Sequence, residues 1–337
     1  MLTIGLDAHQ RLYVICILDQ NGVRVKEAKI RGYWPKLLEE LGKLREPFQI
    51  CFEASCGYGH LYDQLRAVSE RVVVAHPGLL RLIFRSKRKN DRVDAAKLAK
   101  LLFLDEVPPV YVPSMDVRGW RQLIEFRHRT VSKRTRVKNS IRTLLRSHGV
   151  EMPPRHRLWT NKGVTWMSEL DLPTSHSTLQ RDLLVDELES CNRRLTRIER
   201  ELATIADGHP AVTLLRTIPG VGIRTAEAVT AYLDDPRRFS HNRAVGSYVG
   251  LVPSQDQSAG VNRLGRITRQ GPATVRKLLV EAAWQGVRRS PRLKQRFEAY
   301  QRQDPKRKKI ALVATAHHLV RCMHAMMLTG EAWREAA

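Results

Sequence analysis

The chain has 337 residues, of which 42% are hydrophobic and 27% charged, a composition typical of globular proteins with two or three domains. The 58 Lys and Arg against 34 Asp and Glu give a formal net charge of +24, which indicates a polyanionic partner. No stretch approaches the roughly 20 apolar residues of a membrane helix, and no signal peptide is visible, so we expect a cytoplasmic, nucleoid-associated protein. The five cysteines lack paired spacing, which favours reduced thiols over disulfides or a zinc site.

The first hundred residues alternate strand and helix patterns. Helical patterns fall around residues 37–44 and 58–68, and the strand-like runs are LTIGLD, YVICILD, VRVKEAKI, FQICFEAS and RVVVAHP. Short connections between the first three runs predict an antiparallel start, followed by parallel crossovers. This order fits an RNase H-like α/β sheet better than a Rossmann sheet. The proline-rich run VPPVYVPS ends the domain at about residue 110.

Residues 111–208 are predicted to be helical. Basic and apolar residues alternate at helical spacing over 118–147, and Gly149, Pro153 and Pro154 mark the end of that helix. A second helix carries an apolar stripe with spacings of four and three, formed by Leu184, Leu188, Cys191, Leu195, Ile198, Leu202 and Ile205. Such a stripe suits either a coiled coil between chains or a helical hairpin within one chain, and the sequence leaves both open.

Four carboxylates stand where predicted elements end or begin. Asp7 ends the first strand and Glu53 the fourth, while Asp91 and Asp94 open a helix at a spacing that puts both on one face. Two strand ends and a helix start can converge on one point, and Mg²⁺ prefers hard oxygen ligands. We therefore predict a site for two divalent ions that supports phosphodiester chemistry. Each acid alone has an ordinary explanation as a turn residue or, for Asp91, a helix cap.

From residue 209 to the C-terminus, the pattern is that of a mainly helical domain. The segment LLRTIPGVGIRTAEAVTAYL predicts a helix-hairpin-helix, in which Gly220 and Gly222 let backbone N–H groups approach a phosphate, with Arg224 beside them. The alternative is an ordinary corner between two helices.

A short basic loop is predicted after that motif. Ser258 lies there among small residues and is followed by Arg263, Arg266 and Arg269. Its hydroxyl is a candidate nucleophile if a base or metal activates it while arginines steady the phosphate. A turn serine or a neutral phosphate contact is the commoner explanation for such a residue alone, and periodicity does not choose between Ser254 and Ser258.

Several basic clusters are predicted to contact nucleic-acid phosphates. Any single cluster has the alternative of being a solvated basic face. The candidates are Lys87, Arg88, Lys89, Arg134, Arg136, Lys138 and Arg142, with a further run of four cations at 306–309.

The motifs GLDAH, CFEAS, KNDRVDAAKLA, IPGVG and GLVPSQDQSAG occur in an order and spacing that resemble the DEDD transposases of the insertion-sequence one-ten (eleven-eleven) family. The resemblance covers nearly the whole chain. It implies a RuvC-like domain with the RNase H fold, a coiled-coil region and a C-terminal transposase domain, which we place at 1–110, 111–208 and 209–337.

The resemblance also implies roles for residues and partners. Asp7, Glu53, Asp91 and Asp94 would bind Mg²⁺, and Ser258 would become covalently joined to DNA. Family members are recombinases guided by a structured non-coding bridge RNA whose two loops pair with donor and target DNA. The resemblance implies a tetramer built from dimers, whose composite active sites combine a RuvC-like domain and a C-terminal domain of different protomers.

One departure from the family pattern is visible, since the usual Ser-Ser-Gly-Gly is Gln257-Ser258-Ala259-Gly260 here. The leading hypothesis is a transposase that cuts and rejoins DNA through a phosphoserine. The first alternative is a RuvC-like nuclease in which the four carboxylates activate water and Ser258 only contacts phosphate. The second is a non-enzymatic nucleic-acid-binding scaffold.

Overall fold

The computed structural model describes residues 1–55, 57–83, 90–258 and 261–335. Of the residues singled out above, Lys87, Arg88, Lys89, Ala259 and Gly260 lie outside these ranges. The chain divides into two compact units, Met1–Met115 and Asp116–Ala337, which are described separately. Among the described residues, no helix combines the length and apolar character required to cross a membrane.

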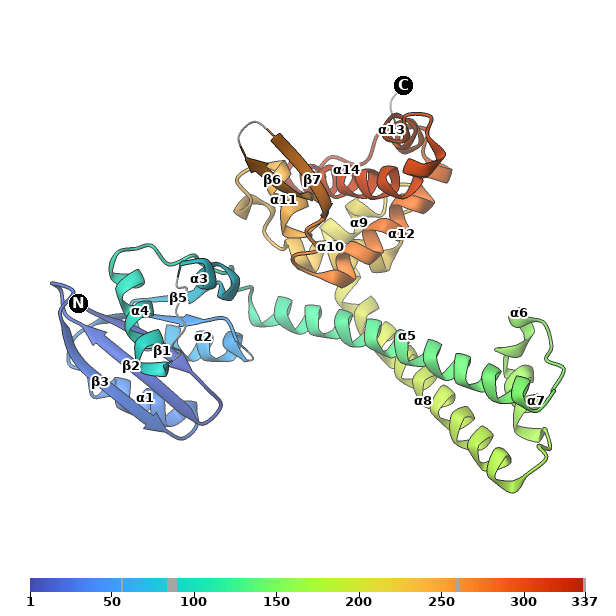
Figure 1. Ribbon diagram of the computed structural model, residues 1–337, viewed down its shortest axis with the longest axis horizontal. Helices are drawn as coiled ribbons and strands as arrows, with labels where there is room; N and C mark the ends of the chain where they lie inside the picture. The colour runs from blue at the N-terminus through green and yellow to red at the C-terminus, as the bar shows by residue number, and fades with distance from the viewer. Residues whose placement is uncertain (56, 84–89, 259–260, 336–337) are drawn as a thin grey trace. The chain divides into compact units, whose positions relative to one another are not determined.

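The first unit is built on a five-stranded sheet with the strand order β3-β2-β1-β4-β5 (Figure 1). β1 pairs antiparallel with β2 and β2 with β3, whereas β1 pairs parallel with β4 and β4 with β5. The predicted antiparallel start and parallel crossovers are thus confirmed. The strands are β1 (Leu2–Ala8), β2 (Leu12–Leu18), β3 (Arg24–Arg31), β4 (Phe48–Glu53) and β5 (Arg71–Ala75).

Helices cover both faces of this sheet. On one face, α1 (Trp34–Gly42) and α2 (Tyr58–Arg66) bury Leu37 and Leu65 against alternate residues of β1, β2 and β4. On the other face, α4 (Asp91–Phe103) packs on β1 and β2, and α3 (Pro77–Ile83) adds Leu80 to a small core beside it. Cys16 and Cys51 are buried free thiols on the α4 side, as predicted for reduced cysteines.

The segment after α4 belongs to the first unit up to Met115. Pro109 bridges Ala75, and the Val110 N–H donates to the carbonyl oxygen of Val74 at 2.7 Å, so the proline-rich run is tied to the edge strand β5. The sequence places the end of the domain at about residue 110, and beyond it Val112 still packs against the core of the first unit.

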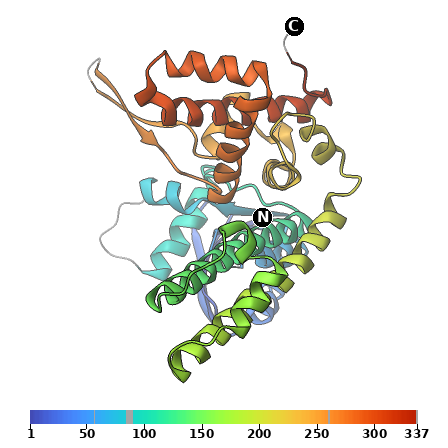
Figure 2. The ribbon, with the colours of Figure 1, turned by 90° about the vertical axis from the view of Figure 1, so that its right-hand side faces the viewer.

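The second unit begins with a long helical hairpin. α5 (Met115–Ser147) and α8 (Ser175–Ala206) run side by side (Figures 1 and 2), with α6 (Arg155–Leu158) and α7 (Asn161–Glu169) at the turn. Nε of Arg127 lies 2.9 Å from Oε1 of Glu199, and Nζ of Lys133 lies 2.8 Å from Oε1 of Glu187, which fixes an antiparallel register. Of the apolar stripe on α8, the five central residues from Leu188 to Leu202 are buried within this chain, and Leu184 and Ile205 are half-buried. The intramolecular hairpin is therefore the arrangement that the structure shows.

The rest of the unit is mainly helical around α14 (Lys308–Thr329), which several other helices contact. An exposed antiparallel hairpin projects from these helices (Figures 1 and 2). It is formed by β6 (Pro253–Ser258) and β7 (Val261–Ile267), so the expectation of a loop around Ser258 is wrong. The remaining elements are α9 (Pro210–Leu215), α10 (Ile223–Leu233), η1 (Pro236–Arg238), α11 (Asn242–Tyr248), α12 (Ala273–Arg289), α13 (Pro291–Gln301) and η2 (Pro305–Arg307).

Candidate active site

The first two carboxylates are brought to one edge of the sheet by strand pairing. β1 and β4 are parallel neighbours, and Leu6 pairs with Phe52 in their register. Asp7 and Glu53 follow these two residues directly, so both lie where the two strands end. The side chain of Asp7 is 20% exposed, and Glu53 is exposed. The predicted convergence of these two strand ends follows from the parallel pairing.

The start of α4 is held close to the end of β1 by a close contact between helix and strand. Gly5 is the reason that the two backbones can approach, since a Cβ atom there would meet the carbonyl oxygen of Ala95 at 2.0 Å and the backbone nitrogen of Ala99 at 2.3 Å. Ala95 and Ala99 are themselves fully buried. Small residues on both elements therefore set where the first turn of α4 lies.

Asp91 is not the cap of α4, contrary to the ordinary explanation considered from the sequence. Asn90 is the capping residue, and its side-chain oxygen accepts a hydrogen bond of 3.0 Å from the backbone N–H of Arg92. Asp91 and Asp94 both lie in the first turn, where the helix dipole favours negative charge. The carboxylate of Asp91 is therefore not used to cap the helix.

Asp7, His9 and Asp91 form a compact group, in which one ligand atom of each residue lies within 4.8 Å of the others. Nε2 of His9 is 3.4 Å from Oδ2 of Asp7 and 3.8 Å from Oδ1 of Asp91. Among the described residues, Glu53 and Asp94 lie outside this group, and Oδ1 of Asp94 is 3.8 Å from Nζ of Lys97. Two of the four predicted acids are therefore brought together with one residue that was not predicted.

His9 is the functional candidate that sequence reasoning missed. The signal was present, because His9 belongs to the motif GLDAH and stands two residues after Asp7. Residues two apart on an extended chain point to the same side, so the imidazole returns to the face that carries the Asp7 carboxylate. Its second partner, Asp91, is distant in sequence and becomes visible only after folding.

The donor set of this group fits a divalent cation. The carboxylates of Asp7 and Asp91 supply the oxygen ligands that Mg²⁺ and Mn²⁺ prefer, and Glu53 and Asp94 end or open neighbouring elements. The imidazole of His9 is a borderline ligand that suits Mn²⁺ better than Mg²⁺. Asp7 and Asp91 would therefore hold the ion.

Ser258 is the last residue of β6, and its side chain is exposed. In the hairpin register Ser258 pairs with Val261, and Asp256 pairs with Arg263. Alternate residues of a strand share a face, so Ser258, Asp256 and Arg263 are on the same side of the hairpin. A Cβ atom at Gly265 would lie 2.4 Å from Oγ of Ser254, so Ser254 is crowded against β7. This packing distinguishes two serines that the sequence left equivalent.

The two glycines of the predicted helix-hairpin-helix differ in their surroundings. Gly220 has a φ of +93°, and a Cβ atom there would meet the backbone nitrogen of Gly286 in α12 at 2.4 Å. Gly222 precedes α10 as its cap residue, and a Cβ atom there would meet nothing within 4 Å. Gly220 therefore serves helix packing, while Gly222 leaves open space beside the start of α10.

Arg224 takes part in a buried ion pair. Its NH1 lies 2.9 Å and 2.8 Å from the two carboxylate oxygens of Glu227, whose side chain is 1% exposed. Burial raises the pKa of Glu227, and the nearby Arg224 guanidinium opposes that rise. Arg224, predicted as a phosphate contact, thus has a structural partner, whereas Arg263, Arg266 and Arg269 are exposed.

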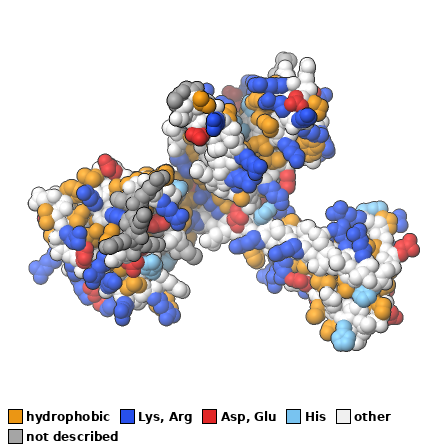
Figure 3. All heavy atoms as spheres, viewed as in Figure 1, with side chains coloured by type: hydrophobic (Ala, Val, Ile, Leu, Met, Phe, Trp, Pro, Cys, Tyr) orange, Lys and Arg blue, Asp and Glu red, His pale blue; other side chains and the backbone are white. Residues whose placement is uncertain are grey.

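Of the cations of α5 that were predicted to contact phosphates, some contact other side chains of the protein and one is exposed. Arg134 is within 3.5 Å of Asn192, and Arg142 contacts Asn139. Nζ of Lys138 lies 4.8 Å from the ring centre of Trp159, and partial burial lowers the pKa of this lysine. Arg136 is exposed. Figure 3 shows Lys and Arg side chains over every part of the visible face, so no single patch on that face accounts for the charge.

Comparisons with known proteins agree on one family. A family model for DEDD transposases of IS110 type, described as a transposase, matches residues 4–149, and a model described as "Transposase IS116/IS110/IS902 family" matches residues 212–298. A "Probable family 20 transposase" of Pseudomonas aeruginosa is 28% identical over 85% of this chain and 84% of that protein. The "Transposase for insertion sequence element IS1111A" of Coxiella burnetii is 25% identical over 83% of this chain and 76% of that protein.

The chain belongs to the IS110 family of DEDD transposases. A further relative, the "Transposase for insertion sequence element IS1328" of Yersinia enterocolitica, is 28% identical over 70% of both proteins. The first matched region of this IS110-family transposase contains all four acids of the predicted site, and the second contains Ser258. The high positive charge agrees with DNA as the substrate of a transposase.

Proposed function

We propose that this IS110-family transposase cuts and rejoins donor and target DNA through a phosphoserine formed on Ser258. The observation that carries the proposal is the convergence of Asp7, His9 and Asp91 at the edge of the sheet, with Glu53 on the adjacent strand end. Such an arrangement of acids from separate elements is what phosphodiester chemistry with divalent ions requires.

A divalent ion held by Asp7 and Asp91 would polarise the scissile phosphate and stabilise the oxyanions of the attacking and leaving groups. His9 holds the two carboxylates in register through its contacts with both. Glu53 and Asp94 complete the acidic edge from β4 and from the first turn of α4.

In the proposed reaction, Oγ of Ser258 forms a bond to phosphorus, and the bond from phosphorus to a deoxyribose oxygen breaks. The serine proton passes to solvent or a base, and the released DNA end gains a proton as its free hydroxyl. Attack of another DNA hydroxyl on the phosphoserine reverses these steps and rejoins a strand without an external energy source. Arg263, which shares a face with Ser258, is placed to contact the phosphate.

A structured non-coding RNA as guide and a tetramer with composite active sites complete the proposal. They are supported by the family to which the chain belongs and by its +24 charge, which suits polyanionic partners. The exposed cations of the α5–α8 hairpin, such as Arg136, and the cations at 306–309 are the candidates for these contacts.

The proposal is tested by detecting DNA that remains attached to denatured protein. The full chain is expressed with its flanking element DNA, the lysate is denatured in detergent, and DNA attached to the protein is measured. Ser254→Ala is the matched control, since Ser254 is a second exposed serine on the same strand. We expect an adduct with the wild type and with Ser254→Ala, and none with Ser258→Ala.

The other outcomes assign the chain to the alternative functions. Cut DNA without any adduct, even on nicked substrates that trap intermediates, would make the chain a hydrolytic RuvC-like nuclease. Salt-dependent binding without any DNA product would make it a nucleic-acid-binding scaffold.

A further inference from the structure

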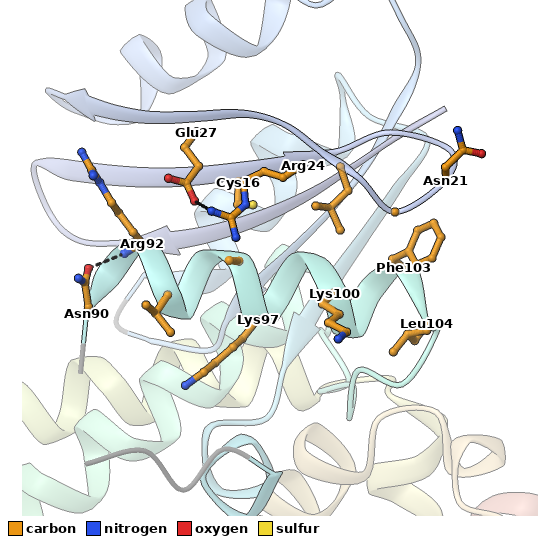
Figure 4. A pocket seen from close by; sticks show the side chains of 14 residues that line it. Cys16, Asn21, Arg24, Glu27, Asn90, Arg92, Lys97, Lys100, Phe103 and Leu104 are labelled. Carbon is orange, nitrogen blue, oxygen red and sulfur yellow. Dashed lines mark hydrogen bonds and ion pairs between the residues drawn. The ribbon is translucent and has the colours of Figure 1, made fainter. Parts of the chain in front are cut away.

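A second functional surface lies in the first unit, on the side of α4 that faces β2 and β3. It is a groove of about 690 Å³ whose charged lining comes from Arg24, Glu27, Arg92, Lys97 and Lys100 (Figure 4). In this view Arg24 and Glu27 come from the strands, and the other three cations come from α4. None of these cations is among the predicted nucleic-acid contacts, because they are separated from one another in the sequence and form no run.

The charge of this groove, called here the α4 groove, is positive by three, since four cations and one carboxylate line it. NH1 of Arg24 lies 2.7 Å from Oε1 of Glu27, and Nζ of Lys97 lies 3.8 Å from Oδ1 of Asp94. Within the described part of the chain, Arg92 and Lys100 have no carboxylate partner. The groove therefore keeps positive charge that its own residues do not neutralise, which suits a polyanion.

The α4 groove begins at the first turn of the helix that carries Asp91 and Asp94. Asn90 and Arg92 line its first part and flank Asp91, and the lining then follows one side of the helix to Lys100. At 1.5 Å per residue, Arg92 and Lys100 are about 12 Å apart along the helix axis, a length that spans several phosphates of one strand. Ala95 and Ala99 on the opposite side of the helix are buried against the sheet, which holds this row of cations in place.

The far part of the groove offers an aromatic side chain. Phe103 is 38% exposed and lines the groove, and Leu104 beside it is 49% exposed. A Cβ atom at Gly22 would lie 2.8 Å from this ring, so the turn between β2 and β3 supports one side of it. Cations followed by an exposed aromatic ring form the pattern by which proteins bind single strands, in which phosphates contact cations and a base stacks on the ring.

We infer that the α4 groove binds the sugar–phosphate backbone of a single nucleic-acid strand that runs alongside the catalytic acids. DNA and RNA share this chemistry, and the test separates them. The inference rests on the proposed function in that a strand bound here leads to the acids of the proposed reaction. Binding in the groove is nevertheless measurable in a protein that performs no reaction.

Lysine acetylation of the full chain, read by mass spectrometry, reports on the groove residue by residue. Lys100 lies in the groove, whereas Lys26 is exposed on β3 and pairs with Ile17, whose side chain packs on the opposite face of the sheet. We expect single-stranded oligonucleotides to slow the acetylation of Lys100 several-fold and to leave Lys26 unchanged. The same oligonucleotide sequence is tested once as DNA and once as RNA. The one that protects Lys100 more strongly identifies the kind of strand that the groove binds.

Binding measured against salt gives a second, independent readout. Arg92→Gln with Lys100→Gln removes two groove cations, and the matched control, Lys26→Gln with Arg45→Gln, removes two exposed cations elsewhere in the same unit. For a single strand, the groove variant is expected to lower the slope of log K against log salt by about 1.4, at about 0.7 per lost phosphate contact. The control variant is expected to leave the slope unchanged.

Equal acetylation of Lys100 with and without nucleic acid, or equal salt slopes for the two variants, would overturn the inference. These results are separable from the phosphoserine proposal, because neither readout depends on cleavage. An adduct on Ser258 without protection of Lys100 would support the proposed function and contradict nucleic-acid binding in the α4 groove.

Discussion

Asp7 and Asp91 lie at the ends of elements packed into buried cores, whereas Ser258 lies on a hairpin in which every residue of β6 is exposed. The positions of the acids are therefore set by the same contacts that stabilise the first unit. No residue of β6 is buried, so core packing does not fix the position of the serine in the same way. The contrast teaches that substitutions near the acids affect stability and chemistry together, while substitutions in the hairpin affect chemistry alone.

The largest expected effect is the loss of cleavage in Asp7→Asn. Removing one charged ligand from the compact group lowers the rate of DNA strand cleavage about a thousandfold, equivalent to about 4 kcal/mol of transition-state stabilisation. Asp105→Asn is the control, because Asp105 is exposed, pairs with Arg71 and has a positive φ that asparagine tolerates. Gel-based cleavage of end DNA measures both variants. Similar cleavage rates for Asp7→Asn and Asp105→Asn would show that Asp7 takes no part in the reaction.

Two arginines of the second unit, Arg224 in the packed helices and Arg263 in the exposed hairpin, should respond oppositely to truncation. Arg224→Ala leaves Glu227 buried without its partner, which costs about 3 kcal/mol of unfolding free energy. Arg263→Ala, in the exposed hairpin, changes stability by less than about 0.5 kcal/mol and weakens DNA binding. Urea unfolding and DNA titration at fixed salt measure these effects. An Arg224→Ala variant that keeps its unfolding free energy but loses DNA affinity would show that Arg224 contacts phosphate.

Gly5→Ala tests how strictly core packing positions the acids. The added methyl group collides with the backbone of α4, which costs about 2 kcal/mol and moves the helix that carries Asp91. Gly42→Ala is the matched control, since a Cβ atom at Gly42 meets nothing within 4 Å. We expect thermal unfolding and cleavage to change together in Gly5→Ala and neither to change in Gly42→Ala. A Gly5→Ala protein with normal cleavage would show that α4 is not held by this contact.

The smallest expected effect is on pH dependence. The pKa of Glu227 is raised above its ordinary value of 4.5 by burial, so the folded state binds its proton more tightly than the unfolded state. This contribution to stability is fully present below pH 4.5 and is lost as pH rises through the raised pKa. Glu227→Gln should remove that decline, whereas Glu281→Gln, at an exposed position, should retain it. Unfolding free energies measured across this pH range decide between them.

Sequence patterns predicted the sheet well because apolar strands of the first unit have unambiguous ends. Asp7 and Glu53 each follow a buried run, so both strand ends were visible in the sequence. The role of Asn90 as the helix cap was not visible in the sequence, because Asn90 and Asp91 are both good capping residues. Only the backbone geometry distinguishes them. His9 was missed because one of its partners comes from another element.

The hairpin was interpreted as a loop for a different reason. Every residue of β6 and each residue of β7 before Ile267 is exposed, so the residues around Ser258 show no alternation of apolar and polar side chains. Backbone pairing alone defines these strands, and sequence periodicity does not report it. Arg224 forms an ion pair with Glu227, three residues further along α10. The sequence did not indicate that Glu227 is buried, so this structural role of Arg224 was not predicted.

The most direct test asks whether the acids and the serine act in one reaction. Purified full-length protein is mixed with end DNA at increasing concentrations of Mg²⁺ or Mn²⁺, and the DNA attached to protein after denaturation is measured for the wild type and Asp91→Asn. We predict that wild-type adduct requires the divalent ion and disappears with a chelator, and that Asp91→Asn binds DNA but forms no adduct. Equal adduct in Asp91→Asn, or adduct that persists with the chelator, would show that Ser258 acts without the acids.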